Sequence, residues 1–124
     1  LRAIHYVCEN ERVQKEVAAL RENRFGEFLR LVKESGDSSY KYLQNVYVCH
    51  DVEHQNVSIA LAISDMILGV QGANRVHGGG FAGTIQAFVP NDLVNAYRSE
   101  MDRIFGQNSC YIMTIRPFGG IEIK

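Results

Sequence analysis

The stretch His77-Gly78-Gly79-Gly80-Phe81-Ala82-Gly83 constrains the fold of this chain more than any other segment, because four of its last six residues are glycine. A loop without side chains can adopt positive φ angles and lets backbone N–H groups approach a ligand or another segment closely. Ala73-Asn74-Arg75-Val76 precedes the loop, and the β-branched and aromatic run Thr84 to Val89, which stops at Pro90, follows it. Together they predict two strands joined by the loop.

Gly78, Gly80 and Gly83 match the dinucleotide-binding pattern G-x-G-x-x-G in spacing. That fingerprint requires a strand before the loop and a helix after it. Because a strand is predicted after Gly83, the match does not indicate a Rossmann fold.

Length and composition indicate one globular domain: 124 residues, 46% of them hydrophobic and 22% charged. Thirteen basic and fourteen acidic residues nearly balance, and no basic run is present, so neither a nucleic acid nor a membrane is predicted as a partner. Three widely spaced cysteines favour reduced thiols and a cytoplasmic location. The chain has no apolar run of membrane-spanning length and no signal peptide pattern.

Apolar spacing predicts two helices that form an αα-hairpin at the start of the chain. The first runs from Arg2 to about Arg21, and the second follows Asn23 as its N-cap and ends at Gly36. From Asp37 to Asp51 no period is clear, so we predict a connection there, with one short extended piece at Val46-Tyr47-Val48.

The rest of the chain predicts two more helices and further strands. One helix covers about Glu53 to Leu68, and another starts at Pro90-Asn91-Asp92 and is closed by Gly106. Cys110 to Ile115 alternates as a strand, and Ile121 to Lys124 adds a last short strand after a turn at Gly119-Gly120. The order predicts an α+β fold: an antiparallel sheet of about four strands with helices on one face, preceded by a helical hairpin.

Three separated motifs resemble the C-terminal half of galactokinases, members of the GHMP kinase superfamily. His5 with Glu9-Asn10-x-Arg12 resembles the family's H-x-x-x-E-N-x-R, and Ser35-Gly36-Asp37-Ser38 its S-H-x-S. The run from Gly72 to Gly83 resembles its third signature, G-A-R-M-T-G-x-G-F-G-G, with one residue inserted near the arginine.

The resemblance implies a ferredoxin-like GHMP C-terminal domain over residues 1–124, a fragment without the N-terminal catalytic and ATP-binding domain. It implies that the full protein uses MgATP to phosphorylate galactose at the anomeric hydroxyl. The N-terminal domain, the sugar and ATP are then the expected partners. Because that domain holds most of the chemistry, the resemblance implies no catalytic and no metal-binding residue in this chain.

The loop is the part of this chain that the resemblance places at the substrate and phosphate cleft. Seven residues are expected to shape it: His77, Gly78, Gly79, Gly80, Phe81, Ala82 and Gly83. His77 stands where the family has Thr, Ala82 replaces a Gly and Gly36 takes a His position. An imidazole there can donate to a phosphate or sugar oxygen. The alternative is a surface histidine that hydrogen-bonds to the loop backbone.

His50-Asp51-Val52-Glu53-His54 matches the zinc-peptidase pattern H-x-x-E-H. The pattern requires both histidines on one helix and a third ligand downstream. Because the segment looks like a helix start, where Asp51 and Glu53 interact with the helix dipole, we expect adventitious metal binding at most.

Three further sets of residues have a structural and a functional interpretation. Glu9, Asn10 and Arg12 form either a solvated face or, as we favour, a polar network that anchors their helix to the N-terminal domain. The tyrosines of the connection are expected at the edge of the core rather than on a sugar, and Cys49 as a small buried hydrophobe.

Two alternatives stay open: another GHMP sugar kinase, such as an N-acetylgalactosamine kinase, or a non-catalytic ligand-binding or regulatory domain of similar fold. A domain taken from a kinase is expected to expose an apolar patch where its partner domain packs, whereas a free-standing domain is expected to have a polar surface.

Overall fold

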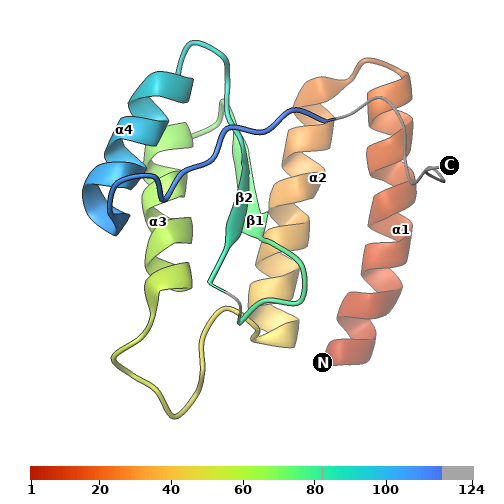
Figure 1. The fold of residues 1–124 in the computed structure, drawn as a ribbon. Helices are drawn as coiled ribbons and strands as arrows, with labels where there is room; N and C mark the ends of the chain where they lie inside the picture. The colour runs from red at the N-terminus through yellow and green to blue at the C-terminus, as the bar shows by residue number, and fades with distance from the viewer. Residues whose placement is uncertain (82, 116–124) are drawn as a thin grey trace, which may run out of the picture.

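The computed structural model describes residues 1–81 and 83–115. In chain order the elements are helix α1 (Arg2–Arg21), helix α2 (Phe25–Ser38), the π-helical turn η1 (Ser39–Leu43), helix α3 (Asn56–Leu68), strand β1 (Ala73–Val76), strand β2 (Ile85–Phe88) and helix α4 (Val94–Phe105) (Figure 1). None of the helices in this part of the chain is both long enough and apolar enough to cross a lipid bilayer.

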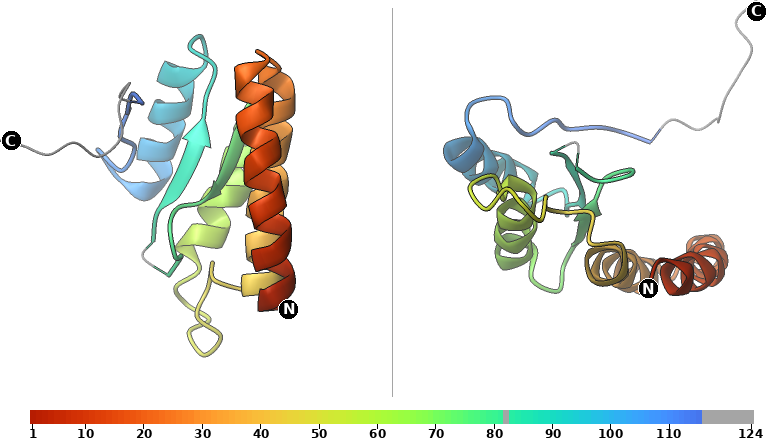
Figure 2. Two further views of the ribbon diagram at one scale, coloured as in Figure 1. Left: turned by 90° about the vertical axis from the view of Figure 1, so that its right-hand side faces the viewer. Right: turned by 90° about the horizontal axis from the view of Figure 1, so that it is seen from below.

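The two strands form an antiparallel hairpin in which Ala73 pairs with Phe88 and Val76 with Ile85. It lies between the α1–α2 pair and the α3–α4 pair (Figures 1 and 2). Successive strand residues point to opposite faces. Ala73 and Phe88 accordingly pack against α2, while Val76 and Ile85 pack on the opposite side with Val57 of α3.

The prediction of helices on one face of the sheet was therefore wrong. Both faces of this short hairpin carry buried residues, and each face needs its own cover. An isolated two-stranded hairpin is marginal in water, so a helix pair on each side supplies the packing that neighbouring strands would otherwise give.

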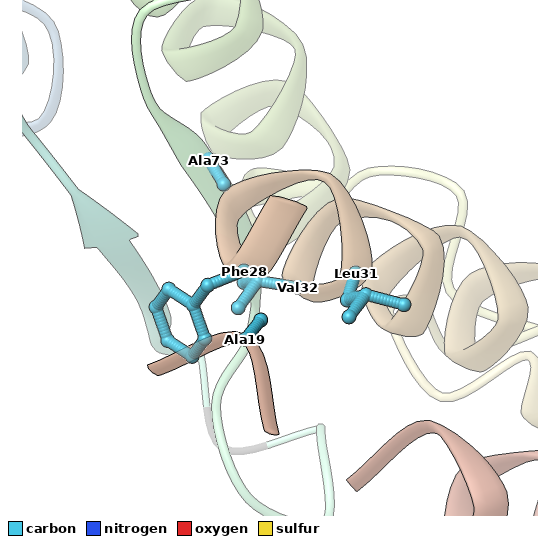
Figure 3. Close-up of a cluster of buried hydrophobic side chains, with 5 residues drawn as sticks. All are labelled: Ala19, Phe28, Leu31, Val32 and Ala73. Carbon is cyan, nitrogen blue, oxygen red and sulfur yellow. The ribbon is translucent and has the colours of Figure 1, made fainter. Parts of the chain in front are cut away.

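The αα-hairpin prediction is confirmed. Ala19 of α1 is fully buried against Phe28, Leu31 and Val32 of α2, and Ala73 of β1 completes this cluster (Figure 3). Phe28 and Phe88 meet edge to face with ring centroids 5.2 Å apart. Asn23 was predicted as the N-cap of α2, but it has a φ of 55° in the connection after α1, and Arg24 occupies the N-cap position.

Gly36 was predicted to end α2, but the helix continues through Ser38 and into η1. The glycine lies where α2 approaches β1 most closely. A Cβ atom at Gly36 would lie 3.0 Å from Arg75 Cβ and 3.1 Å from the Asn74 carbonyl oxygen. The absence of a side chain at Gly36 thus allows a close contact between α2 and β1 and does not mark the end of the helix.

The later helices are confirmed with shifted starts. Helix α3 begins at Asn56 instead of Glu53 and ends at Gly69, which has a φ of 53°. Helix α4 begins at Val94, after Pro90-Asn91-Asp92, and is closed by Gly106 with a φ of 104°. In both helices the glycine adopts a backbone conformation that other residues adopt only with strain.

Two predicted extended segments are not strands. Val46-Tyr47-Val48 is irregular, and Cys110 to Ile115 crosses the molecule without pairing to another described segment. Tyr111, Met113 and Ile115, on one face of this segment, are all at least 79% exposed; on the other face Ile112 is 58% exposed and Cys110 packs partly against the core. Alternation predicts a strand only where one face is buried. Gly119-Gly120 and Ile121 to Lys124 lie outside the described residues, so the described sheet has two strands rather than about four.

The contact of Gly36 with β1 predicts a position-specific loss of stability. We expect Gly36→Val to lower the free energy of unfolding by about 2 kcal/mol, because its side chain overpacks the α2–β1 contact. Gly26→Val is the matched control, since Gly26 lies in the same helix with nothing within 4 Å of a Cβ. Its effect should stay within about 0.5 kcal/mol. Urea unfolding followed by circular dichroism measures both, and equal losses would contradict the contact.

Candidate functional site

The glycine loop joins β1 to β2 at one end of the hairpin, as the sequence predicted. Its base is closed by a hydrogen bond from His77 N–H to the Thr84 carbonyl oxygen at 3.1 Å. Gly78, Gly80 and Gly83 have φ angles of 62°, 76° and 79°, and Phe81 has a φ of 58°. A positive φ is uncommon for a bulky residue, so the surrounding contacts must hold Phe81 in this conformation.

Asn45 supplies those contacts. Phe81 N–H donates to the Asn45 carbonyl oxygen at 3.0 Å, and Asn45 Nδ2 donates to the Gly79 carbonyl oxygen at 3.2 Å. Ser39 Oγ donates in turn to Asn45 Oδ1 at 3.0 Å, which fixes the orientation of the buried amide. The loop is therefore tied by its backbone to the residues that follow η1.

Gly80 is the loop residue that requires the absence of a side chain. A Cβ there would overlap the Asn45 carbonyl oxygen and lie 2.8 Å from Asn45 Nδ2. By contrast, a Cβ at Gly78, Gly79 or Gly83 would meet nothing within 4 Å. Gly80 therefore leaves room for the contact with Asn45, whereas the other glycines leave the outer surface of the loop without side chains.

The outer surface of the loop is suited to donate hydrogen bonds to oxygen atoms of a ligand. Gly78, Gly79 and Gly83 are exposed. No acceptor among residues 1–81 and 83–115 binds the N–H groups of Gly78, Gly79 and Gly80. Successive backbone N–H groups in a turned loop form an anion-binding concavity. Ala82, also predicted for the site, lies outside the described residues.

His77 lies at the start of the loop with an exposed side chain. Its backbone closes the loop, and its imidazole has no hydrogen-bond partner in the part of the chain that the structure describes. The side chain is thus accessible to a ligand at the mouth of the loop.

Arg75, two residues before the loop, ties β1 to both helices of the hairpin. Arg75 Nη1 lies 3.3 Å from Glu9 Oε1 of α1 and donates to Ser35 Oγ of α2 at 2.5 Å, while Arg75 Nε donates to the Val76 carbonyl oxygen at 3.2 Å. Glu9 also binds Arg12 and accepts a hydrogen bond from Ser35. Burial alone raises the pKa of Glu9, but the Ser35 hydrogen bond and the charges of Arg12 and Arg75 outweigh it and hold the pKa below its usual value.

The predicted polar network on α1 is present, but within the described residues it anchors the helix to this chain's own α2 and β1. His5, one turn earlier, is buried, and its Nδ1 lies 3.0 Å from Ser38 Oγ in a hydrogen bond. Asn10 does not take part: its side chain is exposed and donates to the Tyr6 carbonyl oxygen of the same helix.

Glu16 lies on the same face of α1 as Glu9 but lacks the hydrogen bonds that Glu9 makes. Its Oε1 is buried without a hydrogen-bond partner among the described residues. Burial, and next the negative charge of Glu9, raise the pKa of Glu16. Two carboxyl groups of one helix therefore have pKa values shifted in opposite directions.

The H-x-x-E-H segment is not helical; His50 and His54 lie in the irregular connection before α3. No group of three possible metal ligands is brought together in residues 1–81 and 83–115. His54 instead pairs with Asp51. Cys49, predicted as buried, is exposed, and Tyr40 contacts Tyr47 with ring centroids 6.1 Å apart.

Asn45 is the residue of the candidate site that sequence analysis missed. It lies thirty-four residues before Gly79 in the chain, and its only local signal is a polar side chain directly before the apolar Val46. Gln44, with a φ of 54°, ends η1 and turns the chain so that Asn45 reaches the loop. No periodicity reveals such a contact.

The two adjacent glycines of the loop should differ sharply in their tolerance of a side chain. We expect Gly80→Ala to lower the free energy of unfolding by about 2 kcal/mol or more, because its Cβ overlaps Asn45 and its φ is strained. Gly79→Ala, with open space around it, should change stability by less than about 0.5 kcal/mol. Thermal unfolding of both variants measures the difference. A harmless Gly80→Ala would mean that Asn45 does not hold the loop.

The opposite pKa shifts of Glu9 and Glu16 predict opposite effects of two isosteric substitutions. Glu9 stabilises the fold above its unfolded-state pKa, and that stability is lost as the pH falls through its lowered folded-state pKa. Glu16 destabilises the fold at pH values above its own, raised pKa. At pH 7 we expect Glu9→Gln to lower stability by about 1 kcal/mol and Glu16→Gln to leave it equal or raise it.

Urea unfolding at pH 7 and at pH 3 measures both effects. At pH 3 the Glu16→Gln variant should approach the parent, since Glu16 is then protonated. A loss from Glu16→Gln as large as that from Glu9→Gln would contradict the assignment of the unpaired charge.

Comparison with known proteins places these features in a family context. Over 97 residues, 78% of this chain, it is 32% identical to a galactokinase of Haemophilus influenzae (strain PittEE) and equally to one of Glaesserella parasuis serovar 5. It is 34% identical over 104 residues to a galactokinase of Staphylococcus carnosus (strain TM300). The matched part spans 23–25% of the length of these relatives, about a quarter.

No protein-family model matches the chain, and no solved structure matches it. The names of these sequence relatives nevertheless agree with the family that the three sequence motifs resemble. The chain is therefore a galactokinase-related domain, similar to these enzymes over most of its own length and over about a quarter of theirs.

Proposed function

We propose that this chain is the C-terminal domain of a galactokinase of the GHMP superfamily and that its glycine loop shapes the cleft in which sugar and phosphates meet. The observation that carries the proposal is the loop itself: its motif resembles the family's third signature, and its backbone is tied to Asn45 on one side and bare on the other. The similarity to curated galactokinases supports the same assignment.

In the proposed reaction the γ-phosphate of MgATP passes to the anomeric hydroxyl of galactose, giving galactose 1-phosphate and ADP. Phosphoryl transfer depends mainly on positioning and on stabilisation of negative charge. The N–H groups of Gly78, Gly79 and Gly80 can donate to oxygen atoms of the substrates. Because Asn45 fixes the loop beforehand, little reorganisation is needed when charge develops.

His77 is proposed to donate from its imidazole to a phosphate or sugar oxygen. It is exposed at the mouth of the loop, where the resembling motif has a threonine. A histidine carries a ring N–H that can donate a hydrogen bond, as the hydroxyl of a threonine can.

A second domain of the same protein is the proposed partner of this one, and it is proposed to hold most of the contacts to MgATP. The matched relatives are about four times as long as the matched segment. On one face of helix α1, four apolar side chains spaced seven, four and three residues apart are exposed to solvent: Tyr6 is 69%, Val13 43%, Val17 38% and Leu20 47% exposed. An apolar helix face of this kind is typical of a surface that packs on another domain. We also propose a cytoplasmic location, because the three cysteines are free thiols, as a reducing compartment would keep them.

A related GHMP sugar kinase, such as an N-acetylgalactosamine kinase, is the second candidate. The departures at His77 and Ala82 fall in the motif that resembles the family signature, so they favour a test with several sugars rather than galactose alone. A non-catalytic binding or regulatory domain predicts no turnover with any sugar.

The test of the proposed function is sugar-dependent ADP release by the full-length gene product with MgATP. We expect turnover with galactose above that with other hexoses and with N-acetylgalactosamine. Preference for an amino sugar would support the second candidate. No ADP release with any sugar would refute the kinase assignment.

The same assay tests His77. We expect His77→Ala to reduce kcat/KM about tenfold, because one hydrogen-bond donor to the substrates is lost. His50→Ala, an exposed histidine outside the loop, is the control for nonspecific effects. Unchanged kcat/KM in His77→Ala would rule out the contact.

A further inference from the structure

A pocket of about 270 Å³ lies between the glycine loop and the irregular connection that precedes α3. Its polar wall consists of Asp51, His54 and Asn56, and its apolar wall includes Tyr47 and Phe81. Gly83 completes the rim on the loop side. The pocket therefore adjoins the loop without being part of it.

Asp51 and His54 are hydrogen-bonded to each other on the polar wall. His54 Nδ1 lies 2.9 Å and 3.0 Å from the two carboxylate oxygens of Asp51, and the His54 backbone N–H donates to Asp51 Oδ1 at 3.2 Å. The hydrogen bond from His54 holds the pKa of Asp51 below its usual value. Because Nδ1 is occupied, the second ring nitrogen, Nε2, is the one left to bind a ligand.

The apolar wall is held in place by the anchor of the loop. Phe81 is 61% exposed, and its backbone is fixed by the hydrogen bond to Asn45. Val46 and Val57, both buried, form the floor beside it. An aromatic ring next to a set of fixed polar groups is the usual composition of a small-molecule site.

Charge and size limit what the pocket can hold. An ionised Asp51 accepts hydrogen bonds and repels anions, so a phosphate group is disfavoured at this wall. Binding pockets for drug-sized ligands start at about 300 Å³, so 270 Å³ suits one small ring rather than a nucleotide. Asn56 adds an exposed amide that both donates and accepts.

We infer that this pocket binds a neutral, hydroxyl-rich ring, a monosaccharide, with Asp51 and His54 contacting its hydroxyl groups and Phe81 covering its apolar face. The inference rests on the proposed function and deepens it. It gives this domain side-chain contacts to the sugar from the connection before α3, in addition to the backbone of the glycine loop.

Calorimetric titration of the full-length gene product with galactose, without nucleotide, tests the inference. We expect Asp51→Asn and His54→Ala each to raise the Kd for galactose about tenfold, the loss expected for a hydrogen bond to a charged or fixed polar group. Glu53→Gln is the matched control, because Glu53 is exposed on the same connection and does not line the pocket. It should leave the Kd unchanged.

Several results would overturn the inference. One is an unchanged Kd in both pocket variants; another is inorganic phosphate that binds the wild type and binds Asp51→Asn more tightly. If galactose does not bind the wild type, glucose and N-acetylgalactosamine are titrated in the same way, and no binding of any of them also overturns it. The side chain of His54 is 74% exposed, so His54→Ala should fold even if Asp51→Asn does not, and urea unfolding checks both.

The outcomes separate this inference from the proposed kinase function. ADP release with galactose, together with an unchanged Kd in the variants, would contradict the inference about the pocket but not the kinase function. Sugar binding that weakens in both variants, without ADP release, would contradict the kinase function and support the pocket as a sugar site.

Discussion

The contacts of Arg75 join three elements that lie far apart in the chain. Its guanidinium reaches Glu9 of α1 and Ser35 of α2 from a strand that also packs on α3. The contact is possible only because Gly36, next to Ser35, lets α2 approach the backbone of β1. Charge, hydrogen bonding and a missing side chain thus fix the strand that leads into the glycine loop.

The loop then takes its shape from a contact at its far side. Asn45 binds the backbone at Gly79 and Phe81, and Gly80 leaves the space for it. With β1 fixed by Arg75 and the loop fixed by Asn45, the bare backbone of the loop has one orientation. Such preorganisation is what the proposed phosphoryl transfer would require, and it also sets Phe81 at the edge of the neighbouring pocket.

Local signals predicted the helices and the strand–loop–strand unit well. Apolar spacing identified α1 and α4, and Gly69 and Gly106 mark helix ends as expected. Three of the errors have one cause, which is that the residue pattern fits more than one kind of contact. Gly36 resembled a helix stop but serves helix–strand packing, and the alternation from Cys110 to Ile115 lacks a buried face. Cys49 followed an apolar run but is exposed.

The sequence alone determined the four helices and the strand–loop–strand unit, where the glycines of the loop lie and which family the motifs resemble, because these depend on neighbours in the chain. Only the tertiary structure decided that helix pairs cover both faces of the hairpin and that Glu9 and Arg12 bind within this chain. It also decided that Asn45 holds the loop. The contacts of Glu9 with Ser35 and Arg75, and of Asn45 with Gly79, join residues more than twenty-five positions apart, and no local propensity encodes which partner such a residue finds.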